Sequence, residues 1–209
     1  MITINGADIK AFLFDLDGVI IDSESEYTRI WEKIGREYPT GVEDFARKIK
    51  GTTLENILSI YYPDNNVRDL VRKRLYEEEA KMKYRFLPGA LEFLKYLKVN
   101  NIPTALYTSS DQYKMGHLYR DIPDFEKYFR VILTGEDVNR SKPDPEGYIF
   151  AAKSLGVIPE HCAVVEDSLQ GVKAGKAANA FVIGVAGTLD ASTLSPYCNI
   201  VIDNLMQLL

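Results

Sequence analysis

AFLFDLDGVI, residues 11–20, is the stretch of sequence that decides the fold. A run of apolar residues without polar alternation is typical of a strand buried on both faces, as in a parallel sheet. Asp15, Asp17 and Gly18 follow this run, at the strand end where open α/β sheets bind their ligands. Two carboxylates so close together repel each other unless a cation or a proton lies between them. The stretch therefore indicates either a divalent metal with a nucleophilic aspartate, or a solvated Asp-Gly turn.

The composition is that of an ordinary soluble globular protein. The chain has 209 residues, 46% hydrophobic and 26% charged, enough for one core and a small accessory domain. A formal charge of −5 argues against a nucleic-acid partner, which needs clustered basic residues. The first ten residues lack the apolar region of a signal peptide, and no apolar run approaches the roughly 18 residues of a membrane helix. We therefore expect a cytoplasmic protein without a membrane partner, present as a monomer or a weak oligomer.

The pattern between residues 23 and 85 is helical throughout. Apolar residues recur at helical spacing in four successive segments, and turn residues separate these segments. Mixed charges at residues 72–83 are typical of the solvated face of the last helix. The sequence therefore predicts an all-α domain at residues 23–85, inserted into a main domain of residues 1–22 and 86–209. Two capping boxes mark predicted helix starts, Ser23 with Glu26 and Thr52 with Glu55.

Helices and strands alternate from residue 86 onward. The predicted helices are residues 90–99, 111–119, 145–155 and 168–178. The predicted strands are residues 102–108, 130–134, 162–165, 180–185 and 199–202. Such strand–helix units imply an α/β fold with a parallel sheet and right-handed crossovers.

Polar side chains follow the predicted strands at one edge of this sheet. They are Asp15 and Asp17, then Thr108 and Ser109, then Lys142 just before a helix, then Glu166 and Asp167. Each of them alone has a plain structural explanation, such as a helix cap or a solvated loop lysine. Those explanations do not account for their joint order, in which each group follows an apolar strand.

Together these side chains are what phosphoryl transfer requires: a nucleophile, charge neutralisation and in-line positioning. Asp15, as a carboxylate nucleophile, would divide hydrolysis into two displacements through an acyl phosphate. Mg²⁺ binds oxygen ligands, which Asp15, a backbone carbonyl at Asp17, and Asp167 would supply.

The remaining residues would bind the phosphate and move the proton. Lys142 would offset the negative charge of the aspartate and the phosphate together. Thr108 would donate its hydroxyl to a phosphate oxygen, with Ser109 and neighbouring amides beside it. Asp17 would carry the proton to the leaving oxygen and then take one from the attacking water.

Four segments also resemble the four motifs of the haloacid dehalogenase superfamily. They are DLDGVIIDSE (15–24), LYTSS (106–110), SKPDP (141–145) and VVEDSLQGVKAG (164–175), which match in order, spacing and strand context. The resemblance implies a Rossmann-like doubly wound parallel sheet and a mobile helical cap. By motif position it implies a nucleophile (Asp15), an acid/base (Asp17), phosphate ligands (Thr108, Lys142), a magnesium ligand (Asp167) and an indirect or water-mediated partner (Glu166).

Within the superfamily the residues favour a phosphatase. A dehalogenase would leave Asp17 and Asp167 without a role, and a phosphonatase resembling the rest would lack Asp17. Caps of the β-phosphoglucomutase type carry a histidine at the position of Tyr27 and an arginine at that of Leu54. We therefore expect a phosphatase of small phosphorylated metabolites, with sugar phosphates as one class, and keep the mutase as the alternative.

A receiver-type signalling module is the alternative from another class, because it also arranges an acceptor aspartate and an acidic pair around magnesium. In a receiver the acidic pair comes early, whereas Glu166 and Asp167 lie on a late strand, and a helical insert has no place in one. A catalytically silent relative is a further hypothesis, which the intact motif residues disfavour. Glu24 and residues 51–53 are expected where a cap would meet the substrate, or as plain helix capping.

Overall fold

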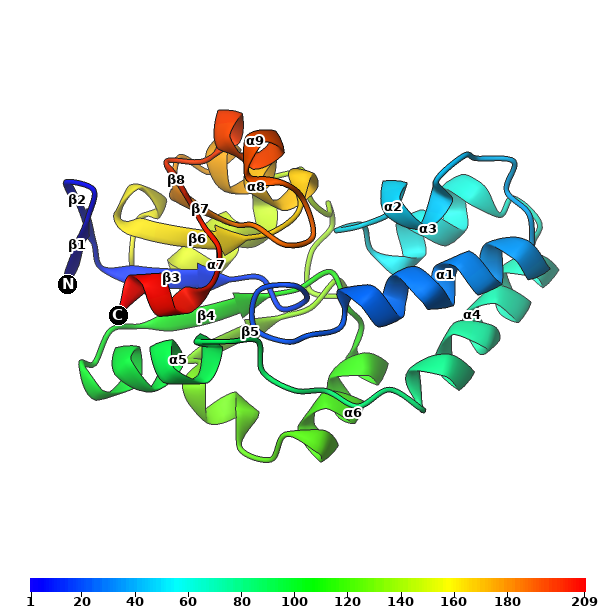
Figure 1. The fold of residues 1–209 in the computed structure, drawn as a ribbon, viewed down its shortest axis with the longest axis horizontal. Coiled ribbons are helices and arrows are strands. Elements are labelled where there is room, and N and C mark those ends of the chain that lie inside the picture. Colours follow the sequence, from blue (N-terminus) through cyan, green and yellow to red (C-terminus); the bar gives the residue numbers. More distant parts are fainter.

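A six-stranded sheet forms the centre of the fold (Figure 1). The computed structural model describes residues 1–209, apart from the side chains of residues 24 and 25. The sheet has the order β5-β4-β3-β6-β7-β8, and all its neighbouring strands run parallel. The direction of winding reverses between β3 and β6, so the predicted doubly wound α/β fold is confirmed. The strands are β3 (Ala11–Phe14), β4 (Thr104–Tyr107), β5 (Val131–Leu133), β6 (Cys162–Glu166), β7 (Phe181–Val185) and β8 (Ile200–Ile202).

Strand β3 is buried on both faces, as its apolar run predicts. Phe12 and Phe14 pack against Phe93 on one face of the sheet, with ring centroids 5.2 and 6.2 Å away. Leu13 points to the other face, where it belongs to the same buried cluster as Tyr148. Each buried side chain of this size contributes about 1.5–3 kcal/mol. The strand that carries Asp15 is therefore anchored from both sides.

Helices cover both faces of the sheet. One face packs against α5 (Ala90–Val99), α6 (Gln112–Asp121) and the 3₁₀ helices η1 (Phe125–Tyr128) and η4 (Leu205–Leu208). The other packs against α7 (Glu146–Ser154), α8 (Leu169–Ala177) and α9 (Ala191–Leu194). Two further 3₁₀ helices are η2 (Pro159–His161) and η3 (Ser195–Tyr197). Among the described residues, none of the helices combines the length and the apolar character needed to cross a membrane.

Four of the five α-helices between β3 and β4 in the sequence form one group, residues 24–79, which we call the helical insert. They are α1 (Glu24–Glu37), α2 (Phe45–Lys48), α3 (Leu54–Tyr61) and α4 (Asn65–Glu79). Figure 1 shows them gathered beyond one end of the sheet. The chain leaves and re-enters the sheet region side by side, because Ile21 pairs with Phe86 in an antiparallel bridge. The predicted division into two domains at these crossings stays a prediction.

The predicted capping boxes are wrong in detail. Ser23 precedes α1 but makes no side-chain cap, because its hydroxyl donates to the carboxylate of Asp17 instead. Thr53, and not Thr52, caps α3, accepting a hydrogen bond from the backbone N–H of Asn56 at 3.4 Å. The first of these differences matters for the site, since it directs a hydroxyl at one of the two strand-end aspartates.

A hairpin at the start of the chain was not predicted. It consists of β1 (Ile2–Ile4) and β2 (Ala7–Ile9), which pair antiparallel. Asn5 and Gly6 join them with φ angles of 47° and 80°. An Asn-Gly pair with both φ angles positive is typical of a tight hairpin turn, so the signal was present in the sequence.

Candidate active site

A pocket lies between the helical insert and the carboxyl ends of β3, β4 and β6. Ligand sites of open parallel sheets form at this edge because the strand-end side chains converge there. The sheet side of the pocket includes Asp15, Asp17, Thr108, Ser109 and Asp167. The insert contributes mainly apolar side chains, including Trp31, Ile49, Leu54, Ile57 and Leu75. The pocket therefore has a charged floor and an apolar roof.

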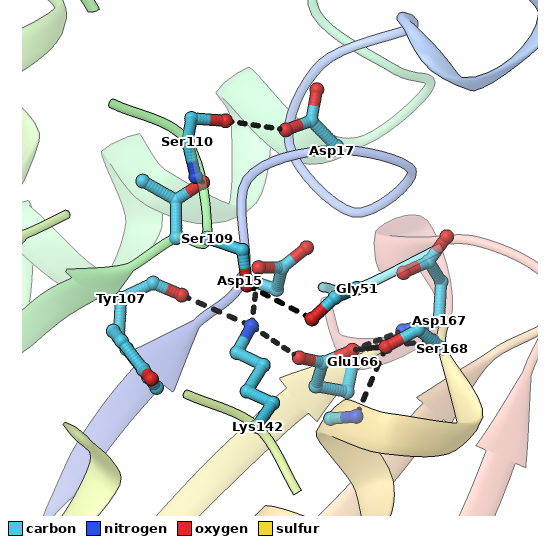
Figure 2. Close-up of polar contacts among 12 residues, drawn as sticks. Asp15, Asp17, Gly51, Tyr107, Ser109, Ser110, Lys142, Glu166, Asp167 and Ser168 are labelled. Atoms are coloured by element: carbon cyan, nitrogen blue, oxygen red, sulfur yellow. Dashed lines mark hydrogen bonds and ion pairs between the residues drawn. The ribbon is translucent and has the colours of Figure 1, made fainter. Parts of the chain in front are cut away.

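Lys142 lies between two buried carboxylates on the charged floor. Its Nζ donates to Oδ1 of Asp15 and to Oε1 of Glu166, each at 2.6 Å, and to the carbonyl of Tyr107 at 3.3 Å (Figure 2). Burial alone would lower the pKa of Lys142, but the two carboxylates outweigh it and raise the pKa above its usual value. Lys142 therefore stays charged and ties β3 to β6 through ion pairs.

Both oxygens of Glu166 are already occupied by donors. Oε1 accepts from Lys142 and from the hydroxyl of Tyr148, at 2.6 and 2.8 Å. Oε2 accepts from the backbone N–H groups of Asp167 and Ser168 and from the Ser168 hydroxyl, at 3.1, 3.2 and 3.0 Å. Glu166 is completely buried, so its carboxylate orients Lys142 and has little capacity left for another ligand. This is what the indirect role predicted for Glu166 requires.

The acidic side chains on the floor fit a divalent cation. Asp15, Glu166 and Asp167 bring carboxylate oxygens within 4.8 Å of one another, and Lys142 offsets only part of their charge. Burial raises the pKa of Asp15 to about 7, although Lys142 opposes the shift. Carboxylate oxygens are hard ligands of the kind that magnesium prefers, so this cluster suits that metal.

Asp17 is held by a separate set of donors. Nζ of Lys114, on α6, binds both carboxylate oxygens of Asp17, and the Ser110 hydroxyl donates to Oδ2 at 3.1 Å. Together with the hydroxyl of Ser23, these donors fix the side chain on the side of Asp15 away from Lys142 (Figure 2). Two lysine–aspartate pairs therefore lie at the pocket, Lys142 with Asp15 beneath its floor and Lys114 with Asp17 in its lining, and Lys114 was not predicted.

The loop after β4 lies against the insert. Thr108 is buried, and its hydroxyl accepts from the backbone N–H of Ser110 at 3.1 Å. The Ser109 hydroxyl donates to the carbonyl of Gly51 at 3.0 Å, which places the loop at residues 51–53 on the pocket as expected. A substrate contact by that loop stays a prediction, and the expectation for Glu24 lies outside the described side chains.

The sequence analysis also missed Glu79, at the end of α4. The prediction of a solvated face there is wrong for this residue, which is 4% exposed and lines the pocket. Its Oε1 accepts from the hydroxyl of Tyr27 at 2.7 Å, and the Nζ of Lys114 lies 4.1 Å from the centre of the Tyr27 ring. The helical spacing of Lys114 and Leu118, one turn apart, was the signal that could have placed Lys114 on a buried face.

The fold and the site define a class of protein. A doubly wound sheet carries paired carboxylates and a lysine at its switch point, and a helical insert closes over them. This arrangement is that of an α/β enzyme for phosphoryl transfer, in which positioning and charge neutralisation supply the catalysis.

Comparison with known proteins identifies the family. A family model of haloacid dehalogenase-like hydrolases matches residues 9–179. A phosphorylated carbohydrates phosphatase from Thermotoga maritima is 36% identical over 180 residues, 81% of this chain and 82% of that protein. Hexitol phosphatase A from Escherichia coli is 32% identical over 192 residues, 89% of this chain and 87% of its own. The chain therefore belongs to the haloacid dehalogenase-like hydrolases, and the predicted enzyme class, a phosphatase of this family, is confirmed.

The fold has close counterparts among solved structures. A β-phosphoglucomutase from Clostridium difficile superposes with a TM-score of 0.79 at 27% identity, over 96% of this chain and 93% of the other. The fold alone thus does not separate a phosphatase from a mutase, and the side chains of the pocket must do so.

Proposed function

We propose that this protein is a magnesium-dependent phosphomonoester hydrolase that acts on a phosphorylated carbohydrate or a related small metabolite through an aspartyl phosphate. The observation that carries the proposal is the ion pair of Lys142 with Asp15, 2.6 Å long and almost fully buried. It supports a strand-end carboxyl group held beside a fixed positive charge, which suits attack on a phosphate group.

Asp15 performs the first displacement. Lys142 and Asp15 Oδ1 are hydrogen-bonded, so the other carboxylate oxygen forms the bond to phosphorus while the bond to the leaving oxygen breaks. The hydroxyl of Thr108 and the backbone amides after β4 hold the phosphate oxygens, with Ser109 beside them. Magnesium, when bound by Asp15, the Asp17 carbonyl and Asp167, supplies further charge neutralisation for the phosphate.

Asp17 handles the protons in both steps. It gives a proton to the leaving alcohol, and then takes one from the water that attacks the phosphorus of the aspartyl phosphate and releases Asp15. In the first step the Asp17 side chain carries this proton as a carboxyl group and turns from Lys114, Ser23 and Ser110 toward the leaving oxygen, and the proton taken from water in the second step restores that form.

The helical insert acts as a cap over this site. We infer a cap domain of residues 23–85 over a core of residues 1–22 and 86–209. Two hydrogen bonds between them support this role: Asn56 to Ser141 at 2.5 Å, and Ser109 to Gly51 at 3.0 Å.

A phosphosugar mutase is the second candidate, favoured by the similarity to a β-phosphoglucomutase structure. Tyr27 donates its hydroxyl to Glu79, and burial raises its pKa, so the ring cannot replace the histidine of mutase caps as a proton carrier. Leu54 lines the pocket without a charge for a second phosphate. Both side chains favour hydrolysis.

The test is phosphate release from a panel of sugar phosphates, polyol phosphates, nucleotides and β-glucose 1-phosphate. We expect release with magnesium, loss in EDTA, recovery on adding magnesium, and a loss of about 1,000-fold or more in Asp15→Asn and in Asp17→Asn. Circular dichroism checks that both variants remain folded. Formation of glucose 6-phosphate with little free phosphate would establish the mutase instead, and chelator-resistant hydrolysis would exclude the metal.

A further inference from the structure

Glu79 places a carboxylate on the apolar side of the pocket. The residue is 4% exposed and lines the pocket together with insert side chains such as Leu75 and Ile57. Burial raises the pKa of Glu79 to about 7, because the charged form loses its hydration there. A carboxyl group is costly at such a place unless its oxygens have partners.

Only one of the two oxygens of Glu79 has such a partner among the described side chains. Oε1 accepts from the Tyr27 hydroxyl at 2.7 Å, whereas Oε2 is buried and makes no hydrogen bond. Lys114 is the neighbouring cation, but its Nζ donates to both oxygens of Asp17 and lies over the Tyr27 ring. One oxygen of the Glu79 carboxyl group is thus fixed by Tyr27, and the other is a buried acceptor without a hydrogen bond to any described residue.

The position of Glu79 relates this atom to the substrate of the proposed reaction. Asp15 and Asp17 line the floor of the same pocket. A row of contacts leads from there to Glu79: Lys114 binds Asp17 and lies over the Tyr27 ring, and the Tyr27 hydroxyl donates to Glu79. A leaving group that extended from a phosphate at Asp15 along this row of contacts would meet Glu79. The apolar side chains around it exclude water from the carbon skeleton.

We propose that Glu79 is a specificity-determining residue whose Oε2 hydrogen-bonds a hydroxyl group of the leaving alcohol, so that the enzyme selects phosphate esters of polyhydroxylated compounds. This inference rests on the proposed phosphatase function and deepens it. A hydroxyl group both donates and accepts, so it pairs with Glu79 whether the carboxyl is ionised or protonated. A site that binds a hydroxyl in this way disfavours an analogue that lacks it, because the carboxyl then stays unpaired.

The test compares two substrates with the same six-carbon chain, sorbitol 6-phosphate and hexyl phosphate. We expect kcat/KM of the wild type to favour the polyol ester about 100-fold or more. Glu79→Leu should reduce this preference at least about tenfold, and Glu79→Gln, which keeps a hydrogen-bonding oxygen, should reduce it less. Glu77→Gln, the same change two positions away on an exposed part of α4, is the matched control and should keep the wild-type preference.

Either of two results with the variants would overturn the inference: a preference in Glu79→Leu within twofold of the wild type, or an equal loss in Glu77→Gln. A wild type that hydrolyses hexyl phosphate as well as the polyol ester also overturns it. Binding of sorbitol 6-phosphate in EDTA, followed by the fluorescence of Trp31, the one tryptophan of the chain, separates this inference from the proposed reaction. If Glu79→Leu weakens this binding and the wild type shows no turnover when magnesium is added, the role of Glu79 is supported and the hydrolase is refuted, whereas binding insensitive to Glu79 refutes the role.

Discussion

The two lysine–aspartate pairs of the pocket are built in different ways. Lys142 and Asp15 belong to the sheet edge, where Glu166 gives the lysine a second carboxylate at 2.6 Å. Lys114 and Asp17 face the helical insert, and the Asp17 side chain keeps 17% of its surface exposed. The first pair is therefore fixed at the sheet edge. The second joins Asp17 to a lysine of α6 that lies over the Tyr27 ring, so the insert contributes to its surroundings.

Removing Lys142 should lower the free energy of unfolding more than any other change considered for these two pairs. Lys142→Met leaves the carboxylates of Asp15 and Glu166 buried together without their cation, so the free energy of unfolding should fall by about 4 kcal/mol. Urea denaturation in EDTA measures the loss. Lys127→Met is the control, because Lys127 pairs with Asp124 on the exposed surface, and it should change the stability little. A loss no larger than that of the control would show that the buried pair is not structural.

The pH dependence of stability tests the burial of Glu79, the carboxyl group that the insert places at the pocket. Glu79 has an ordinary pKa of 4.5 in the unfolded chain and one of about 7 in the folded protein, because of its burial. Between these values the folded state keeps a proton that the unfolded state has released, so stability falls as the pH rises. Glu79→Gln removes this dependence, and its stability relative to the wild type should rise by about 3 kcal/mol from pH 4.5 to about pH 8.

Urea denaturation at a series of pH values measures this difference. Glu77→Gln changes a glutamate whose side chain is 49% exposed, and its stability relative to the wild type should vary little with pH. If the Glu79→Gln difference were equally flat, the carboxyl group would not be buried in solution.

Removing Lys114 should have the smallest effect. Lys114→Met deprives Asp17 of its cation, but the hydroxyls of Ser23 and Ser110 continue to donate and the carboxylate can reach water. We expect a loss of about 1 kcal/mol in the free energy of unfolding, well below that for Lys142→Met. Side-by-side denaturation of the two variants gives the comparison directly, and equal losses would contradict the distinction between the two pairs.

The sequence predicted the pair on the sheet edge and missed the one at the insert for a physical reason. Asp15, Lys142 and Glu166 each follow an apolar strand or precede a helix, and parallel strands must bring their carboxyl ends together. The surroundings of Asp17 have no such rule behind them. Tyr27 and Glu79 are 52 positions apart, and Asp17 and Lys114 are 97 apart, so only the tertiary packing brings them together.

The local signals succeeded to different degrees as well. Ser168 caps α8 as predicted, accepting from the backbone N–H of Gly171 at 3.0 Å. Ser23 carries an equally good capping pattern, but its hydroxyl is drawn to Asp17, an electrostatic partner that the local pattern does not contain. Helices and strands were therefore predictable, whereas the polar contacts made across the pocket were not.

The paired crossings between the sheet and the insert have a consequence for how such a protein changes over generations. The backbone N–H of Asp22 bonds to the carbonyl of Arg85 at 3.0 Å, and that of Leu87 to the carbonyl of Ile20 at 2.9 Å. Because hydrogen bonds join the two crossings, the residues between them can be lengthened, shortened or exchanged without altering the spacing of β3 and β4. A lineage built on this plan can acquire new substrates by recombination while it inherits its phosphate chemistry intact.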